Sequence, residues 1–153
     1  MDAGAGGGMP EETFDVVVVG GGPAGSTAAN DLARRGRRVL LLDRAGRIKP
    51  CGGAIPPKAI EEFEIPDALL VAKVTSARMI SPTAKAVDMP IDGGFVGMVD
   101  RADFDEWLRE RAAGSGAVRR TGTFELFTRD ADGIARVHYR AKGAAATAPT
   151  LSV

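Results

Sequence analysis

Residues 14–43 hold the feature that most constrains the fold, a strand–turn–helix–strand pattern built around a glycine-rich turn. The apolar run at 14–19 predicts a buried strand, and the turn that follows it reads Gly-Gly-Gly-Pro-Ala-Gly. A helical pattern then continues to Arg35, and residues 39–42 predict a second strand. This order is that of one βαβ unit with G-x-G-x-x-G in its first turn. The sequence therefore predicts an α/β fold with a parallel sheet.

The turn has the residue types that phosphate binding needs. Gly20 permits a tight turn off the strand, and Gly22 lets the backbone approach a diphosphate without a Cβ in the way. Gly25 lets the helix lie close to the sheet. Asp43 lies at the end of the second strand, where a carboxylate accepts hydrogen bonds from ribose hydroxyls. The alternative is a glycine-rich turn that only packs. The candidate dinucleotide-binding residues are Gly20, Gly22, Pro23, Ala24, Gly25 and Asp43.

Composition narrows the class of protein. The chain has 153 residues, enough for one domain, and its 20 acidic and 20 basic side chains give no nucleic-acid footprint. One cysteine and one histidine exclude an internal disulfide and argue against a structural metal site, so we expect no metal. No apolar run is long enough for a bilayer, and the first residues do not form a secretory signal. We therefore expect a cytoplasmic protein.

The rest of the chain divides by pattern. We expect a disordered lead-in at 1–13, a single domain at 14–141 and a loose tail at 142–153. A long loop with prolines and glycines follows Asp43 and precedes a short helix that begins after Pro56. The remaining elements expected are strands at 74–80, 85–89, 95–99 and 117–120, a helix at 101–113 capped by Asp100, and a β-hairpin from 124–128 and 134–139.

Three stretches carry a resemblance to a known family: GGGPAG at 20–25, Asp43-Arg44, and KPCGGAIPP at 49–57. Together they resemble the geranylgeranyl reductases of chlorophyll and bacteriochlorophyll synthesis, flavoproteins of the para-hydroxybenzoate-hydroxylase-like superfamily. The stretches at 78–82, 87–101 and 104–112 are similar to the same family. The resemblance implies non-covalent FAD, electrons from NADPH, and reduction of carbon–carbon double bonds in a geranylgeranyl group to give phytyl. The group would be carried on (bacterio)chlorophyll or on the free diphosphate.

The resemblance also implies roles for single residues. The turn glycines correspond to the contacts with the FAD diphosphate, Asp43 to the adenosine ribose, and Arg44 to the adenosine side of the site. Arg101 corresponds to an arginine near the FAD phosphates, where a guanidinium neutralises charge; the alternative is a solvent-exposed first-turn arginine. Cys51, Gly52 and Gly53 correspond to a loop that places flavin or substrate; the alternative for Cys51 is a small buried hydrophobe. No residue that would activate its thiol is visible in the sequence.

The chain departs from the family in its last part. Two later flavin-binding signatures, Gly-Ala-Asp-Gly and Gly-Asp-Ala, do not occur. We therefore expect an incomplete, truncated Rossmann-like FAD-binding domain, a βαβ core plus a β-meander or hairpin, with exposed apolar surface, weak FAD retention and no turnover. The expected partner is an isoprenoid or geranylgeranyl-tetrapyrrole substrate, with peripheral contact to a photosynthetic membrane through that substrate. The alternatives are an FAD-dependent aromatic hydroxylase of the same superfamily and a non-catalytic dinucleotide-binding remnant.

Overall fold

The computed structural model describes residues 12–44, 48–143 and 151–152. The chain divides into two compact units, the first made of Met1–Arg47 with Leu108–Val153 and the second of Ile48–Trp107. Within the described residues no helix is long and apolar enough to cross a membrane. The first unit contains the predicted βαβ pattern, and the second contains the KPCGGAIPP stretch.

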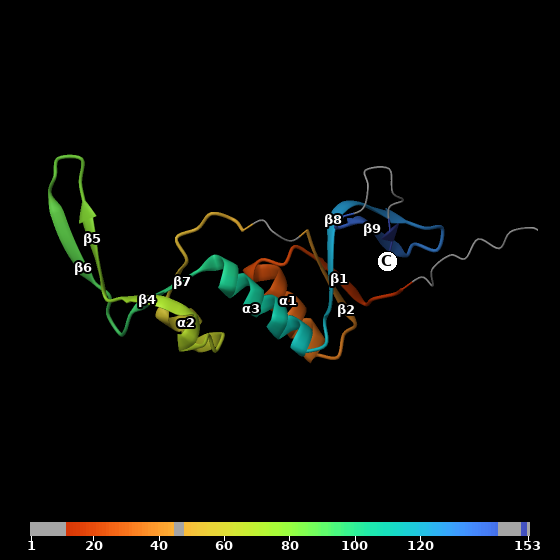
Figure 1. The fold of residues 1–153 in the computed structure, drawn as a ribbon, viewed down its shortest axis with the longest axis horizontal. Coiled ribbons are helices and arrows are strands. Elements are labelled where there is room, and N and C mark those ends of the chain that lie inside the picture. Colours follow the sequence, from red (N-terminus) through yellow and green to blue (C-terminus); the bar gives the residue numbers. More distant parts are fainter. Residues whose placement is uncertain (1–11, 45–47, 144–150, 153) are drawn as a thin grey trace, which may run out of the picture. The chain divides into compact units, whose positions relative to one another are not determined.

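The first unit is built on a mixed sheet (Figure 1). Strand β1 (Val16–Val19), helix α1 (Pro23–Arg34) and strand β2 (Val39–Asp43) follow one another as expected, and β1 pairs with β2 in parallel. Strand β8 (Val118–Arg129) lies parallel to β2 on its other side. The sheet continues antiparallel through β9 (Ala135–Ala141) to β10 (Leu151–Ser152), in the order β1-β2-β8-β9-β10. The prediction of an α/β Rossmann-like fold is confirmed.

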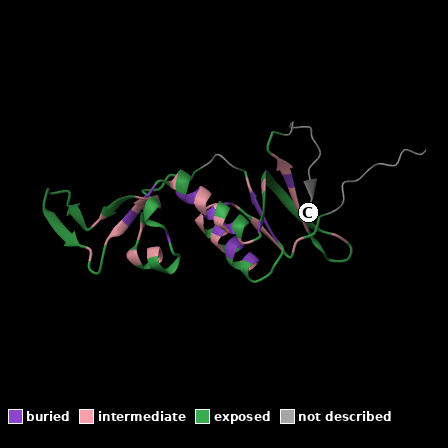
Figure 2. Cartoon of the chain, turned by 60° about the horizontal axis from the view of Figure 1, so that its bottom comes forward, coloured by how far each residue is buried: buried purple, intermediate pink, exposed green. Residues whose placement is uncertain are grey.

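The core of this unit lies between β2 and two helices. The four apolar residues of β2 are at most 1% exposed, because this strand has a neighbour on each side and helices against its face. Small side chains allow α1 and the last turns of α3 (Arg101–Gly114) to pack closely, and Ser115 Oγ donates to Asn30 Oδ1 at 2.8 Å beside them. Figure 2 shows these buried positions in purple. The cluster consists of Ala29, Ala33, Val39, Leu41, Ala112 and Ala117.

Strand β1 differs from the sequence expectation. The apolar run predicts a buried strand, yet the first three residues of β1 are only partly buried and Val19 is 51% exposed. The physical reason is position in the sheet: among the described strands β1 pairs with β2 alone, so it forms an edge. A run of valines reports strand propensity, and it does not report the number of neighbouring strands.

The second unit contains two small antiparallel sheets. The first has the order β3-β7-β4, with β3 (Ala54–Ile55), β4 (Leu70–Val74) and β7 (Val96–Val99). Helix α2 (Pro57–Glu62) follows β3, and a 3₁₀ turn, η1 (Asp67–Leu69), precedes β4. The second sheet is the hairpin of β5 (Ser76–Ile80) and β6 (Ala86–Pro90), which is exposed along its length (Figure 2).

Asp100 Oδ1 accepts a hydrogen bond from the Ala102 N–H at 2.7 Å, as expected of a cap at the start of α3.

Some element boundaries differ from the expectation. The segment expected as one strand at 74–80 holds the end of β4 and all of β5, and β3 lies inside the expected loop after Asp43. Residues 151–152, within the expected loose tail, pair with β9. The lead-in up to residue 11 and residues 144–150 lie outside the described residues, so the proposed domain limits stay a prediction.

Candidate functional site

The turn after β1 is held against β2 and α1 by close backbone contacts. The Gly20 N–H donates to Leu42 O at 2.8 Å, which fixes the turn to the neighbouring strand. A Cβ added at Gly25 would lie 1.9 Å from Gly20 O, so only glycine permits the observed approach of helix and turn. Gly20 itself has a φ of +109°. The predicted tight turn and close helix packing are therefore present.

Helix α1 begins without a side-chain cap. Its N-cap is Gly22, in an extended conformation, and Pro23 is its first residue. The N–H groups of a first helical turn have no partner within the helix, and the positive end of the helix dipole lies there. A Cβ added at Gly22 would meet nothing within 4 Å, so open space adjoins the backbone at this point. Ala24 is exposed beside it. The arrangement suits an anion.

Arg109 joins this turn to the acid at the end of β2. Its Nη1 donates to Gly21 O at 2.9 Å and lies 3.5 Å from Asp43 Oδ2. Ser26 Oγ also donates to Gly21 O, at 3.1 Å. Neither Arg109 nor Ser26 is among the residues expected from the sequence. The partners of Arg109 lie far from it along the chain, and no local pattern marks either residue as a donor to this turn.

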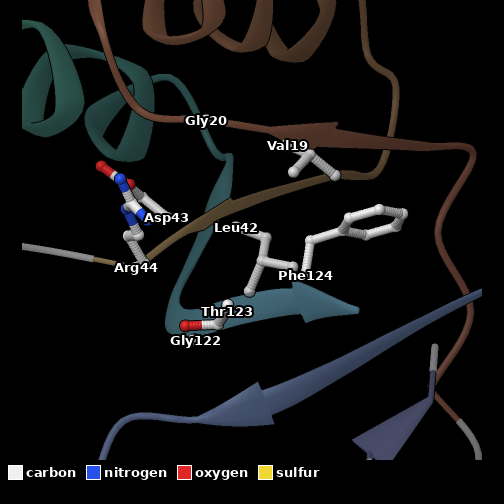
Figure 3. A pocket seen from close by; sticks show the side chains of 8 residues that line it. All are labelled: Val19, Gly20, Leu42, Asp43, Arg44, Gly122, Thr123 and Phe124. Atoms are coloured by element: carbon white, nitrogen blue, oxygen red, sulfur yellow. The ribbon is translucent and has the colours of Figure 1, made fainter. Parts of the chain in front are cut away.

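A cleft of about 250 Å³ opens at the carboxyl ends of the parallel strands. Asp43 and Arg44 line one side of it, and the side chains of Val19, Leu42 and Phe124 face one another across it (Figure 3). Ligands of open α/β sheets bind at this end of the strands. The sequence indicated Asp43 and Arg44 but not the contribution of β8. The lining residues are Val19, Gly20, Leu42, Asp43, Arg44, Gly122, Thr123 and Phe124.

The remaining candidate residues form a group in the second unit. The Cys51 thiol is exposed, and the Gly53 N–H and, to a smaller degree, the Arg101 guanidinium lower its pKa below the ordinary range. This corrects the expectation that the thiol has no activating neighbour and the alternative that it is buried. Gly53 has a φ of +70°, and a Cβ there would lie 2.2 Å from Val99 O, so this loop requires glycine. Gly52, between them, is exposed.

Arg101 is not the solvent-exposed arginine of the alternative interpretation. Its side chain is 15% exposed, and it binds Asp105 in a two-pronged pair, with Nε to Oδ1 and Nη2 to Oδ2 both at 2.9 Å. This pairing raises the pKa of Arg101 above its ordinary value. Arg101 is therefore a fixed cation beside Cys51. Among the residues that the structure describes, no three His, Cys, Asp or Glu side chains gather as metal ligands.

Comparison with known proteins agrees with this geometry. The model of the pyridine nucleotide-disulphide oxidoreductase family matches residues 14–106. A geranylgeranyl diphosphate reductase from Rhodobacter capsulatus is 71% identical over 117 residues, covering 76% of this chain and 30% of that protein. The chloroplastic geranylgeranyl diphosphate reductase of Oryza sativa subsp. japonica is 43% identical over 133 residues, covering 81% of this chain and 28% of that protein.

Solved structures show the same relationship. A geranylgeranyl bacteriochlorophyll reductase-like protein from Thermoplasma acidophilum matches with a TM-score of 0.77 and 26% identity, covering 88% of this chain and 36% of that one. The myxobacterial chondrochloren halogenase, an FAD-dependent halogenase, matches with a TM-score of 0.74 and 24% identity over 92% of this chain and 35% of its own. At that identity the halogenase shows a shared fold alone.

The chain belongs to the pyridine nucleotide-disulphide oxidoreductase family. Within this class of oxidoreductases its relatives are geranylgeranyl reductases, and the resemblance carried by the KPCGGAIPP stretch is confirmed. The chain spans about 30% of the length of the geranylgeranyl diphosphate reductases of Rhodobacter capsulatus and Oryza sativa subsp. japonica.

Proposed function

We propose that this chain is the part of a geranylgeranyl reductase that binds FAD through its ADP moiety. The start of α1 supports this most directly, because open space adjoins its N-cap, Gly22, and Gly20 of the same turn lines the cleft together with Asp43. The match to the oxidoreductase family, together with the shared fold of an FAD-dependent halogenase, supports the choice of flavin.

The described residues fit this group. The diphosphate would lie against the backbone at Gly22, where a Cβ meets no atom and a helix N-terminus favours negative charge. The ribose would take the Asp43 carboxylate as a hydrogen-bond acceptor, and the adenosine would occupy the cleft beside Arg44. Gly20, Pro23, Ala24 and Gly25 shape the backbone there.

The second group of candidate residues, in the second unit, is assigned to the flavin or the substrate. We assign to the Cys51, Gly52 and Gly53 loop the placement of the flavin ring or the isoprenoid chain, since the close backbone packing at Gly53 holds the loop in one conformation. Arg101, anchored by Asp105, would neutralise phosphate charge. Both roles are proposals for these residues.

The reaction we propose is reduction of the double bonds of a geranylgeranyl group, with NADPH as the electron donor. Bound FAD would supply hydride transfer. The curated relatives are named for geranylgeranyl diphosphate and the Thermoplasma structure for geranylgeranyl bacteriochlorophyll, so we propose a geranylgeranyl substrate in one of these two forms. Such a substrate is strongly apolar, and contact with a membrane surface would come through it.

FAD binding by the 153-residue chain tests the proposal. Gly22→Ala adds a methyl group that the empty protein accommodates but that occupies the space of the diphosphate. We expect the variant to fold with unchanged stability and to bind FAD at least about tenfold more weakly, the loss of roughly 1.4 kcal/mol. Flavin fluorescence titration measures the affinity.

Gly114→Ala is the matched control. Gly114 also has open space at its Cβ, and it lies at the end of α3, away from the turn. FAD affinity is expected to be the same in this variant and the unsubstituted chain. Equal affinity of Gly22→Ala and Gly114→Ala would contradict the proposed diphosphate site.

A further inference from the structure

Two side chains from different helices donate to one backbone carbonyl in the glycine turn. Ser26, on α1, donates through Oγ to Gly21 O at 3.1 Å, and Arg109, on α3, donates through Nη1 at 2.9 Å. Ser26 is fully buried, and the Arg109 side chain is 19% exposed. An arginine and a serine thus fix the direction of a carbonyl that belongs to neither helix.

Fixing this carbonyl also fixes the next N–H. A trans peptide is planar, and its C=O and N–H point in opposite directions; the described residues contain no cis peptide. The N–H of Gly22 therefore points away from Ser26 and Arg109. Within the described part of the chain this N–H has no hydrogen-bond acceptor, and the space at Gly22 is open.

The packing around Gly21 leaves the guanidinium little freedom. Gly21 is buried, and a Cβ there would lie 2.6 Å from Asp43 Oδ2 and 3.0 Å from Arg109 Cδ. The arginine is therefore packed against the peptide it holds, and the Nη1 that donates to Gly21 O also lies 3.5 Å from Asp43 Oδ2. A charged donor on the carbonyl also polarises the peptide and makes its N–H a better donor.

We propose that Arg109, together with Ser26, is a positioning residue for the diphosphate. By holding Gly21 O these residues aim the Gly22 N–H at the bound phosphates before the ligand arrives. Arg109 Nη1 also lies 3.5 Å from Asp43 Oδ2, but the role proposed for it concerns the Gly21–Gly22 peptide and the diphosphate alone. This inference rests on the proposed function, since it assigns a role within the same site.

The test compares ADP with adenosine on the 153-residue chain by isothermal titration calorimetry. Arg109→Met removes the donor, and we expect ADP affinity to fall about tenfold, as for the loss of one charge-assisted hydrogen bond. Adenosine affinity should change less than about threefold, since adenosine makes no diphosphate contact. Arg109→Lys keeps a cationic donor, so its ADP affinity should lie between that of the unsubstituted chain and that of Arg109→Met.

Ser26→Ala removes the second donor without touching Asp43. Like Arg109→Met, it should lower the preference for ADP over adenosine. It also tests the inference if the Arg109→Met variant does not fold. Arg34→Met is the matched control, because Arg34 is an exposed arginine in the last turn of α1. It removes the same charge from the same unit and should leave the preference unchanged.

The outcomes separate the two claims. An unsubstituted chain that binds neither ligand overturns the proposed function. A chain that binds both, while Arg109→Met and Ser26→Ala keep its preference for ADP, overturns the positioning role alone. Equal loss of ADP and adenosine affinity also overturns it, because a purely structural residue would weaken both ligands together.

Discussion

The Cys51 thiol shows how much a few neighbours change the chemistry of an exposed residue. Hydrogen bonding from the Gly53 N–H is the largest cause of its lowered pKa, and the hydrogen bond from Arg101 is the second. Both stabilise the thiolate. Because Arg101 is held by Asp105, its charge has a fixed position next to the sulfur. The thiolate fraction at neutral pH is therefore higher than that of an ordinary exposed cysteine.

This arrangement predicts a pH profile. In the unsubstituted chain, alkylation of Cys51 by iodoacetamide should reach half its maximal rate below the ordinary thiol pKa, because thiolate persists to lower pH. Arg101→Met should move that midpoint upward, but not fully to the ordinary value, since the Gly53 N–H remains. Arg101→Met leaves the Asp105 carboxylate without this arginine, so the alkylation rates are measured at a temperature below the melting transition of the variant.

Lys49→Met is the control for general loss of positive charge. Lys49 acts on Cys51 only through the electrostatic attraction of its charge, which is the smallest contribution to the lowered pKa of the thiol. This variant should therefore shift the midpoint less than Arg101→Met does. Equal shifts in the two variants would show that total charge, not the Arg101 hydrogen bond, controls the thiol.

The close packing of α1 against α3 depends on small side chains. Ala112 is completely buried within the cluster that also contains Ala29 and Ala33. Ala112→Leu forces the helices apart and should reduce the free energy of unfolding by about 1–3 kcal/mol. Ala113 is exposed on the same helix, and Ala113→Leu should change it by less than about 0.5 kcal/mol. Urea unfolding followed by circular dichroism measures both, and equal effects would contradict this account of the packing.

Some helices and strands follow from local sequence pattern, and others do not. The turn glycines, α1 and β2 follow from local pattern and were predicted with bounds close to those observed. Most of strand β4 could not be predicted, because its sequence, LVAKV, shows no alternation of apolar and polar residues. The role of Arg109 could not be predicted, because its hydrogen bond to Gly21 spans 88 residues and depends on how α3 returns to the sheet. Local periodicity carries no information on such contacts.

The expected exposed apolar surface is present in both units of the chain. Met79, Ile80 and Val87 of the β5–β6 hairpin are each more than 60% exposed, and Phe127 of β8 is 65% exposed. Met79 and Val87 are direct cross-strand partners, so they share one face of the hairpin. Neighbouring exposed apolar side chains on a strand surface favour association.

We therefore predict that the chain self-associates partly through this hairpin. Met79→Thr with Val87→Thr keeps strand propensity while it removes apolar area, so the hairpin should persist and the fraction of associated species should fall. Sedimentation velocity over a range of protein concentrations measures the change. ADP affinity should be unaltered, because neither residue is among those that line the cleft. An unchanged distribution of species would place the associating surface elsewhere, with the exposed face of β8 around Phe127 as the next region to substitute.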